Sequence, residues 1–513
     1  MGSCDRRVFL GRIGSGMLAS VVGLGVGQDL GLNGVLFAGE VGRLNFGDLE
    51  PLVSMMQETS ADALMPRLKA ELDRGTNLST LITAAALANA RTFGGEDYTG
   101  YHCFMAMVPA LAMSRQLSGS RAALPVLKVL HRNARRTQAH GGRRNEVLLP
   151  VVPDKSFAGD AQAYLLAAGR DGQFDDAEAT LASVSGQGPE AAFAALQPLV
   201  RDNIDVHQVV LAYRSFDMMQ LTGPDNGQVL LRQVLRQCIN RDESRRRQGR
   251  QAPAIRTLLP ALMDAHGLNG EIEATKALSP AEFEELAQLI FTADRDEAAG
   301  AVAAQLASGV SGDDMGEALS LAAVRLLLHD PGRSRGTEGK PKGSVHGASV
   351  GLHAADTANA WRGIATATGG SNANACLVTA AWHAAGQSGR MDRLKPHHAS
   401  EREFASTVPP EKLLGALGET LRDGDQKRSC ALVERYGELD RDPAALIAVL
   451  IEPALEYDGA LHHEKYFHTA TQEYARSRPE SRWNHLVALA RVMASGYGFE
   501  AEGLAAAKSA LAV

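Results

Sequence analysis

The sequence predicts an all-α protein made of stacked helical hairpins that form a bundle or an α/α toroid-like array. Alanine and leucine dominate the composition, aromatic residues make up only 5% of the chain, and runs of alternating Val, Ile and Thr are scarce. This balance favours helix over sheet. Leu64, Leu68 and Leu72 recur at a spacing of four, which is the periodicity of one helix face.

Helical patterns and turn signals divide the first half of the chain into short helices. Residues 48–90 contain two, and the turn Phe93-Gly94-Gly95 follows them. A helix opens near Tyr98, and we expect Pro109 to kink or end it because proline lacks the amide proton. The other helices expected here cover residues 124–136, 160–181, 188–201 and 228–238, and one more lies within 202–223.

More helices are expected in the second half. The stretch 279–306 begins with Ser279, Pro280 and Glu282, a capping box with proline at the first helical position. Pro331 closes a helix, because the chain then becomes polar and rich in glycine. The other helices expected here cover residues 252–266, 374–385, 410–422, 426–436 and 442–451. A further helix opens within 342–362, and helical i,i+4 pairs occur in the block 456–498.

These elements suggest four segments. Residues 1–40 form a leader, 41–330 an N-terminal helical region, 331–343 a flexible loop or linker, and 344–513 a C-terminal helical region packed with the first as one unit. The segment 331–343 is polar, basic and glycine-rich, as loops and linkers are. Two interpretations stay open for it: an inert surface connection, or a lid over a site that begins at His346, since lids often flank chemistry.

The charge balance and hydropathy exclude some classes of partner. The net charge is −7 and the pI is near 6.1, so nucleic acid is not expected as the main partner. The basic run at residues 241–250 is interpreted as a solvated helix end or loop. No segment after the leader has the long uninterrupted apolar run that a membrane helix needs, so we expect no mature membrane span.

The cysteines do not form a metal or disulfide pattern. Of the five, Cys4 lies in the leader and the others are isolated along the chain. That spacing is neither a zinc ribbon nor a dense disulfide framework. Cys103, Cys238 and Cys376 lie in apolar helical contexts and are expected to be buried free thiols.

The leader carries an export pattern. Residues 5–11 read Asp-Arg-Arg-Val-Phe-Leu-Gly, and an uncharged apolar stretch follows at residues 13–26. This resembles the twin-arginine (Tat) export signal, although Asp at the first place and Gly at the last depart from the family's pattern. The resemblance implies an exported, periplasmic protein of the bacterial cell envelope, with the twin-arginine export machinery as a partner. Because that route carries folded proteins that often hold a cofactor, it also favours a bound metal or organic group.

One stretch, residues 342–362, has the composition of a catalytic site. His346 and His353 are seven residues apart, and Asp356 follows His353 by three, so all three share one side of a helix. Small residues surround them and leave room for a bound group. We therefore take His346, His353 and Asp356 as candidate catalytic residues.

A second set suggests a metal site assembled from several helices. Asp458 and His462 are four residues apart, as are Glu464 and His468, and an i,i+4 pair chelates a metal more easily than a pair seven apart. A histidine also opens other helices that later carry an aromatic residue and an arginine. The candidate metal ligands, suited to Fe, Mn or Zn in a helical bundle, are His102, His207, His353, Glu464 and His468.

Missing motifs narrow the chemistry. The chain has no GxGxxG followed by an acidic residue, no GxxxxGK[ST] and no HExxH, which disfavours nucleotide binding and ordinary zinc proteolysis. Residues 347–351 match GxSxG by sequence, but they open a predicted helix with no strand pattern before it, which disfavours the nucleophile elbow of an α/β-hydrolase. Neutral imidazoles beside carboxylates also serve acid–base catalysis without metal. The side chains expected to line an organic substrate pocket in that case are Tyr98, Tyr101, Tyr213 and Trp361.

The helices that carry His102, His207, His353 and His468 lie within residues 96–498. A helical chain with histidines separated in this way resembles the questin oxidase-type proteins, which are helical oxygenases. The resemblance implies oxidation rather than hydrolysis. We therefore expect an exported helical enzyme, an oxidoreductase acting on a small organic substrate at a histidine- and carboxylate-lined interior site. Two alternatives stay open: a non-catalytic helical-repeat binding or scaffold protein, and a hydrolase with an unrecognised nucleophile.

Overall fold

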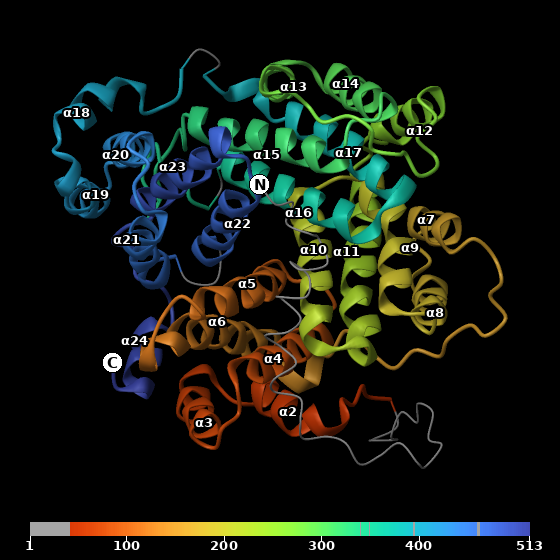
Figure 1. Cartoon of the computed structure of the whole chain (residues 1–513). Helices are drawn as coiled ribbons and strands as arrows, with labels where there is room; N and C mark the ends of the chain where they lie inside the picture. The colour runs from red at the N-terminus through yellow and green to blue at the C-terminus, as the bar shows by residue number, and fades with distance from the viewer. Residues whose placement is uncertain (1–41, 339, 348, 393–394, 459–461) are drawn as a thin grey trace.

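The computed structural model describes residues 42–338, 340–347, 349–392, 395–458 and 462–513, so the predicted leader at residues 1–40 lies outside the described part. Within those ranges the fold has 23 α-helices and no strand, which confirms the predicted all-α class (Figure 1). The short 3-10 helices are η2 (Gly47–Leu49), η3 (Gly119–Ala123), η4 (Gly142–Asn145), η5 (Pro224–Asn226), η6 (Ser388–Arg390), η7 (Ala399–Glu401) and η8 (Pro410–Lys412).

The first helices form the red and orange layer at the bottom of Figure 1. They are α2 (Glu50–Glu58), α3 (Ala61–Asp73), α4 (Leu78–Phe93), α5 (Tyr98–Ser114) and α6 (Leu124–His140). Pro109 lies within α5 without ending it. The last helix of the chain, α24 (Leu504–Leu511), packs against α3 and α6, so the C-terminal end joins the N-terminal layer.

A second group of helices follows in yellow. It consists of α7 (Ala161–Asp171), α8 (Phe174–Ser185), α9 (Pro189–Asp202), α10 (Val206–Thr222) and α11 (Gly227–Arg247). The single helix predicted at residues 160–181 is two helices. Gly172 separates them because it adopts a left-handed backbone conformation, with φ of 76°, which glycine tolerates without steric cost.

The third group contains α12 (Ile255–Ala265), α13 (Pro280–Thr292), α14 (Arg295–Ala307), α15 (Gly312–His329), α16 (Val350–Thr368) and α17 (Gly370–Ala385). The capping box predicted at Ser279 is present, with Glu282 as its reciprocal partner. The predicted stretch 279–306 is nevertheless two helices, because Asp294 caps a new helix start by accepting hydrogen bonds from the backbone amides of Asp296 and Glu297.

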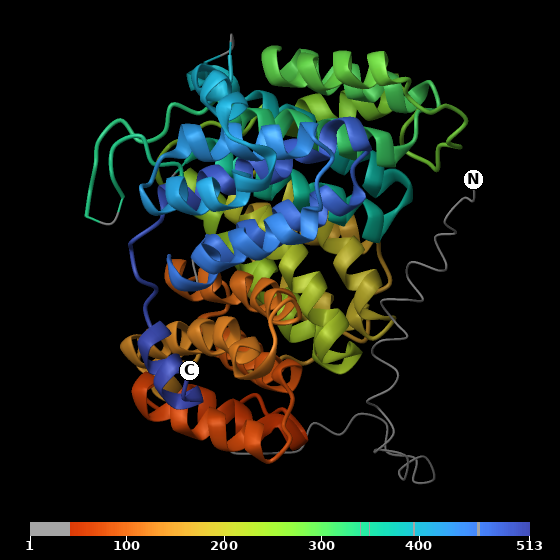
Figure 2. The same ribbon diagram turned by 60° about the vertical axis from the view of Figure 1, so that its left-hand side comes forward.

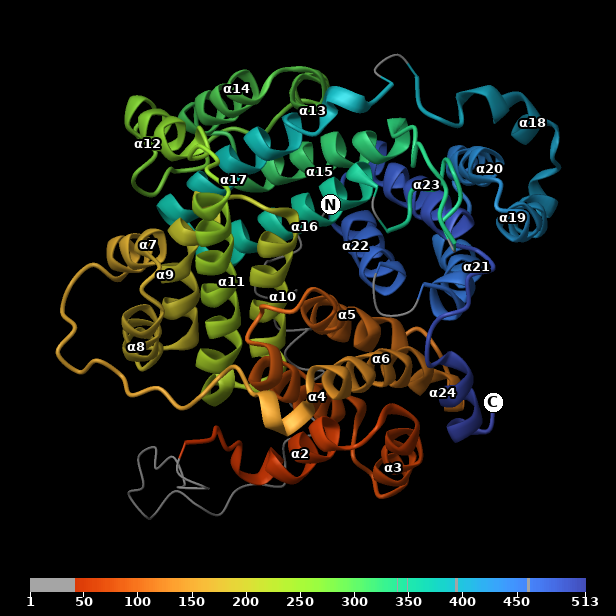
Figure 3. The same ribbon diagram turned by 180° about the vertical axis from the view of Figure 1, so that it is seen from behind.

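The fourth group, drawn in blue, contains α18 (Arg402–Thr407), α19 (Leu413–Arg422), α20 (Gln426–Glu438), α21 (Pro443–Glu456), α22 (His463–Arg476) and α23 (Pro479–Ser495). Helix α22 packs against both α16 and α5, and the view from behind shows it beside α16 and above α5 (Figure 3). The fourth group therefore closes the molecule against the first.

Four helices, α5, α10, α16 and α22, form the centre of the fold, and we call them the inner helices. Each packs against the next, and α22 packs back against α5, so the four contacts form a closed cycle. Each inner helix also packs against a neighbour in sequence, namely α6, α11, α15 or α23. Figure 2 shows blue helices of the fourth group above the orange layer of α5 and α6, in agreement with the contact between α22 and α5. This arrangement of packed helical hairpins agrees with the predicted bundle or α/α toroid-like array.

Buried charges connect two of the inner helices away from their starts. Glu473 of α22 accepts a hydrogen bond of 2.8 Å from Arg362 of α16 and also pairs with Arg476. Asn359 donates to the same carboxylate at 2.8 Å. The aromatic–arginine pattern noted in the sequence thus marks, in these two helices, a buried ion-pair network.

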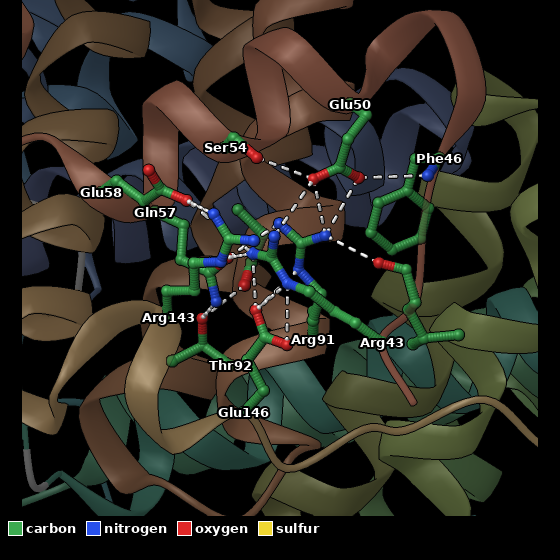
Figure 4. Close-up of polar contacts among 12 residues, drawn as sticks. Arg43, Phe46, Glu50, Ser54, Gln57, Glu58, Arg91, Thr92, Arg143 and Glu146 are labelled. Carbon is green, nitrogen blue, oxygen red and sulfur yellow. Dashed lines mark hydrogen bonds and ion pairs between the residues drawn. The ribbon is translucent and has the colours of Figure 1, made fainter. Parts of the chain in front are cut away.

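A second network fastens the N-terminal segment to the first layer (Figure 4). The guanidinium of Arg91, which is fully buried at the end of α4, donates to the Glu50 carboxylate at 2.9 Å and to Gln57 at 2.8 Å. Glu146 lies 3.3 Å from Arg91 and 2.7 Å from Arg43. Each buried charge therefore has a partner of opposite sign, as burial requires.

Helices α15 and α16 approach so closely that only glycine fits at their contact. A Cβ atom added at Gly351 would lie 2.7 Å from the backbone nitrogen of Leu327 and 2.9 Å from the carbonyl carbon of Leu326. These are backbone atoms, so they cannot rotate away. The start of α16 is thus positioned against α15 by the absence of a side chain.

We expect Gly351→Ala to lower the free energy of unfolding by about 1–3 kcal/mol, the usual cost of overpacking a core. The measurement is urea denaturation followed by circular dichroism. Gly300→Ala in α14 is the matched control, because a Cβ there meets nothing within 4 Å. The control should be neutral or stabilising by up to ~1 kcal/mol. Equal effects of the two substitutions would contradict the close contact.

Candidate functional site

The starts of the four inner helices bring four histidines together, which we call the histidine tetrad: His102, His207, His353 and His462. The imidazole centroids of His102 and His207 are 4.8 Å apart, and those of His207 and His353 are 5.3 Å apart. His353 and His462 are separated by 5.3 Å, and His462 and His102 by 5.7 Å. The tetrad therefore forms a closed cycle of ring contacts, one histidine from each inner helix.

Local sequence explains why each histidine lies at a helix start. Asp97 caps α5 by accepting a 2.7 Å hydrogen bond from the backbone amide of Gly100. Asp205 caps α10, and the Ser349 hydroxyl caps α16. Such side chains satisfy the free amides of a first turn. His462 is the N-cap residue of α22, but its side chain forms no capping hydrogen bond.

Most of these imidazoles are oriented by their own helix start. The Nδ1–H group of His102 donates to the carbonyl of Tyr98 at 2.7 Å, and that of His353 donates to the carbonyl of Ser349 at 2.7 Å. His207 Nδ1 lies 3.2 Å from the Asp205 carboxylate. Because the acceptors are a carbonyl or a carboxylate, Nδ1 carries the proton and Nε2 presents a lone pair.

The lone pairs inside the tetrad have no protein donor. Among the described residues, the Nε2 atoms of His102, His207 and His462 are buried without a hydrogen-bond partner. Buried polar atoms are normally paired, and unpaired ones require an explanation. Several of them at one point indicate a site that is completed by another molecule.

Burial favours the neutral form of three tetrad members. It lowers the pKa of His102 and His462 well below the ordinary 6.5 and lowers the pKa of His353 to about 4. Lys465, in the first turn of α22, adds positive charge nearby, and burial lowers the pKa of its own ammonium to about 8. Neutral imidazoles at pH 7 can accept a proton or a hydrogen bond.

A pocket of about 390 Å³ opens beside the tetrad, and we call it the tetrad pocket. This volume suits a small organic molecule. Tyr98 lies at its edge, with 56% of its surface exposed. The lining residues are Tyr98, Val206, His207, Lys340, Gly347, Ser349, Val350, His353, Gln387 and His462.

Of the three predicted catalytic residues, only His353 lines the tetrad pocket. The backbone amide of His346 donates to Ser495 at 3.1 Å, and its ring lies 5.9 Å from that of His463. Asp356 is buried and accepts a 2.8 Å hydrogen bond from Thr469. The idea that His346 and His353 share one helix face also fails, because α16 starts only at Val350.

The predicted metal set is brought together only in part. His102, His207 and His353 meet in the tetrad, but Glu464 forms a buried ion pair of 2.6 Å with Lys128. No ring contact joins His468 to the tetrad in the described part of the chain. The charged groups that act on the His468 imidazole are instead the arginines Arg214, Arg476 and Arg115. Glu464 and His468 therefore do not complete the expected ligand set.

The donor set that is present does not fit a metal ion. Within the residues that the structure describes, no group of three or more His, Cys, Asp or Glu side chains could hold one. The expected iron, manganese or zinc site is therefore not formed by these side-chain positions.

His462 is the tetrad member missing from the predicted ligands. The i,i+4 spacing predicts only that His462 lies near Asp458. In the structure, the Nδ1 atom of His462 lies 3.7 Å from the Asp458 carboxylate. The signal that identifies it is its position at the start of a helix, which it shares with His102, His207 and His353. The i,i+4 spacing of Glu464 and His468 was the misleading signal.

Two of the four aromatic residues predicted to line a pocket lie beside the tetrad, and the other two do not. Tyr98 and Tyr101 lie beside the tetrad, with ring centroids 4.2 Å and 5.0 Å from His102. Trp361 is buried in the core, and Tyr213 packs against Gly363 of α16. The cysteines of the described residues are free and buried, as predicted. No helix in the described ranges is both long and apolar enough to cross a membrane.

In comparisons with models of known protein families, with curated proteins and with solved structures, the chain finds no match. The tetrad and its pocket therefore carry the functional argument by their own geometry.

We expect the free energy of unfolding to fall as the pH decreases from about 6.5 to about 4. The unfolded chain binds a proton at His353 in this window and the folded chain does not, so stability rises with pH there. One such group contributes at most about 1.4 kcal/mol per pH unit. His353→Gln should reduce the slope measured by urea denaturation at several pH values by up to this amount, while His102 and His462, whose pKa values are also lowered, keep their own contributions. His266→Gln, outside the tetrad, should keep the original slope, and an unchanged slope in both variants would contradict a neutral buried His353.

Proposed function

We propose that the protein is an exported oxidoreductase that binds a small organic substrate in the tetrad pocket and uses neutral histidines as proton acceptors. One observation carries this proposal. Imidazoles from four separate helices meet beside a pocket, with Nε2 lone pairs that no described residue satisfies. Convergent polar groups with perturbed pKa values beside an apolar pocket are the usual mark of an active site.

His207 is the best placed general base. It lines the pocket, and its Nδ1 lies 3.2 Å from one oxygen of Asp205, whose other oxygen is 3.0 Å from Arg241. The carboxylate orients the imidazole and stabilises the imidazolium that forms when Nε2 takes a proton from the substrate. His353 and His462 line the same pocket and can accept hydrogen bonds from the substrate.

Oxidation is the reaction class that we favour, and the resemblance to questin oxidase-type proteins supports it. Removal of a substrate proton by His207 leaves an electron pair on the substrate. We propose that dioxygen accepts this pair: a bond forms between the deprotonated substrate carbon and one oxygen, and the imidazolium of His207 returns its proton to the other oxygen, so that substrate and dioxygen give a hydroperoxide. The sequence lacks a dinucleotide-binding motif that would supply another electron acceptor.

The alternatives have weaker support. A hydrolase needs an activated nucleophile, yet the Ser349 hydroxyl of the pocket donates to Asp330 at 2.7 Å and caps α16. Burial raises the pKa of the Cys103 and Cys430 thiols to about 12, which disfavours thiolates. A scaffold protein would have its histidines scattered and locally paired, whereas the tetrad joins four of them, and three of the four have a buried nitrogen without a partner among the described residues.

We expect His207→Gln to lower turnover by about 100-fold or more, the usual contribution of a general base. The assay incubates the purified chain in air with a panel of small ketones, phenols and aromatic acids, and measures dioxygen uptake and product mass. His468→Gln is the matched control, since it also removes a helical histidine but lies outside the tetrad pocket. Absence of turnover in the unmodified chain, or equal activity of the two variants, would overturn the proposed function.

The export part of the proposal is tested separately. It is supported by the pattern at residues 5–11, which lie outside the described part of the chain. Changing Arg6 and Arg7 together to Lys should block export, and the precursor should remain in the cytoplasm on cell fractionation. Arg12→Lys, in the same leader, should leave export intact. Export of the double variant at the original level would contradict a twin-arginine route.

A further inference from the structure

The wall of the tetrad pocket is electrically one-sided. Its described lining contains one ammonium, from Lys340, and three imidazoles, but no Asp or Glu. This contrasts with the chain as a whole, whose net charge is −7. A pocket lined by a single sign of charge concentrates ligands of the opposite sign.

Lys340 is held over the pocket by its loop. Its backbone amide and carbonyl each form a 2.9 Å hydrogen bond with Thr337, which closes a tight turn. Its side chain then lies along Gly347, where an added Cβ would be 2.9 Å from Nζ and 3.1 Å from Cε. Gly347 has φ of 78°, so a residue with a side chain is disfavoured there both by backbone conformation and by contact with Lys340.

The Lys340 ammonium has no anionic partner among the described residues. The nearby carboxylates are committed elsewhere. Asp330 accepts from Ser349 and from the Gly351 amide, Asp205 pairs with Arg241, and Asp458 lies 3.7 Å from the His462 Nδ1 atom. The segment that contains Lys340, residues 331–343, was interpreted from sequence as either an inert connection or a lid, and its ammonium lines the pocket.

The inner helices add to the positive potential. The first residue of α5, of α10 and of α16, and the N-cap residue of α22, all line the pocket. The N-terminal end of a helix carries a partial positive charge and attracts anions. At α22, the N-cap side chain satisfies none of the first-turn amides.

A buried polar group independently indicates a ligand here. His462 is 3% exposed and lines the pocket, and its Nε2 has no hydrogen-bond partner in the described ranges. A lone pair in that position accepts a hydrogen bond from a hydroxyl or amide of a bound molecule. The site therefore offers an ammonium for an anionic group and imidazole nitrogens for a donor group.

We infer that the tetrad pocket takes a small organic carboxylate, with Lys340 pairing with the carboxylate and determining specificity. This inference rests on the proposed function, because it treats the tetrad pocket as the substrate site. A single ammonium and no arginine in the lining match one negative charge. Phosphate recognition more often uses several donors or a bidentate arginine.

Benzoate and its neutral analogue benzamide test the inference by isothermal titration calorimetry on the full chain at pH 7.5. We expect benzoate to bind at least tenfold more tightly than benzamide, with an affinity that falls as salt is added. Benzamide binding as tightly as benzoate, or no saturable binding of benzoate, would overturn it. Inorganic phosphate serves as a third ligand, and tighter binding of phosphate than of benzoate would also count against an organic carboxylate.

Substitutions of Lys340 and Lys342 test which residue causes the preference for benzoate. Lys340→Gln should remove the preference for benzoate, and Lys340→Arg should retain it. Lys342→Gln is the matched control, because Lys342 is exposed in the same loop and does not line the pocket. A preference that survives Lys340→Gln, or that is lost equally in Lys342→Gln, refutes the role of Lys340. Circular dichroism confirms that each variant is folded.

The two proposals fail in different ways. If the chain binds benzoate through Lys340 but turns over no substrate, the proposed enzyme is wrong and the ligand class stands. If turnover depends on His207 but Lys340→Gln does not raise KM for carboxylate substrates, the enzyme stands and this inference is wrong. The expected result is at least a tenfold higher KM with kcat almost unchanged, as loss of uniform binding predicts.

Discussion

The fold depends on the meeting of four helix starts at its centre. Because α5, α10, α16 and α22 pack in a closed cycle, their first turns are brought to one point from distant parts of the chain. A histidine at each start must then share a small volume with the other three. Their centroids lie within 5.7 Å of the next neighbour around the cycle, so no tetrad member is isolated in its own helix.

Such a meeting has an electrostatic consequence. Helix starts carry partial positive charge, and protonated imidazoles there would repel one another and lose their hydration. Burial lowers the pKa of three tetrad members, His102, His353 and His462, so neutral imidazoles are the form that the fold accommodates. The buried Lys465 and the ion pair of Lys128 with Glu464 lie on or against the same helix, α22. Lys465 thus retains positive charge beside the tetrad, because the Lys128–Glu464 pair carries no net charge, while these three imidazoles stay neutral.

The close packing that creates this centre also shapes the pocket. Gly351 lets α16 approach α15, and Gly363 lets it receive the Tyr213 ring of α10. Gly347 leaves room for the Lys340 side chain at the pocket. The absence of a side chain at Gly351 and Gly363 thus sets the position of α16. The absence of a side chain at Gly347 allows the Lys340 ammonium to face the pocket.

The sequence by itself determined the helical class and many of the positions where helices start and end. Composition indicated the all-α class, and the capping box at Ser279 marked a true helix start. Histidines near helix starts also singled out His102, His207 and His353, because position relative to a helix terminus is a local property.

Only the tertiary structure decided which histidines meet. Glu464 and His468 share a helix face in sequence, yet packing turns Glu464 toward Lys128 and places His462 in the tetrad instead. Spacing along one helix fixes the relative directions of side chains but not the rotation of that helix against its neighbours. That rotation follows from contacts among residues hundreds of positions apart, so the partner of each imidazole and the pocket beside it exist only in the folded chain.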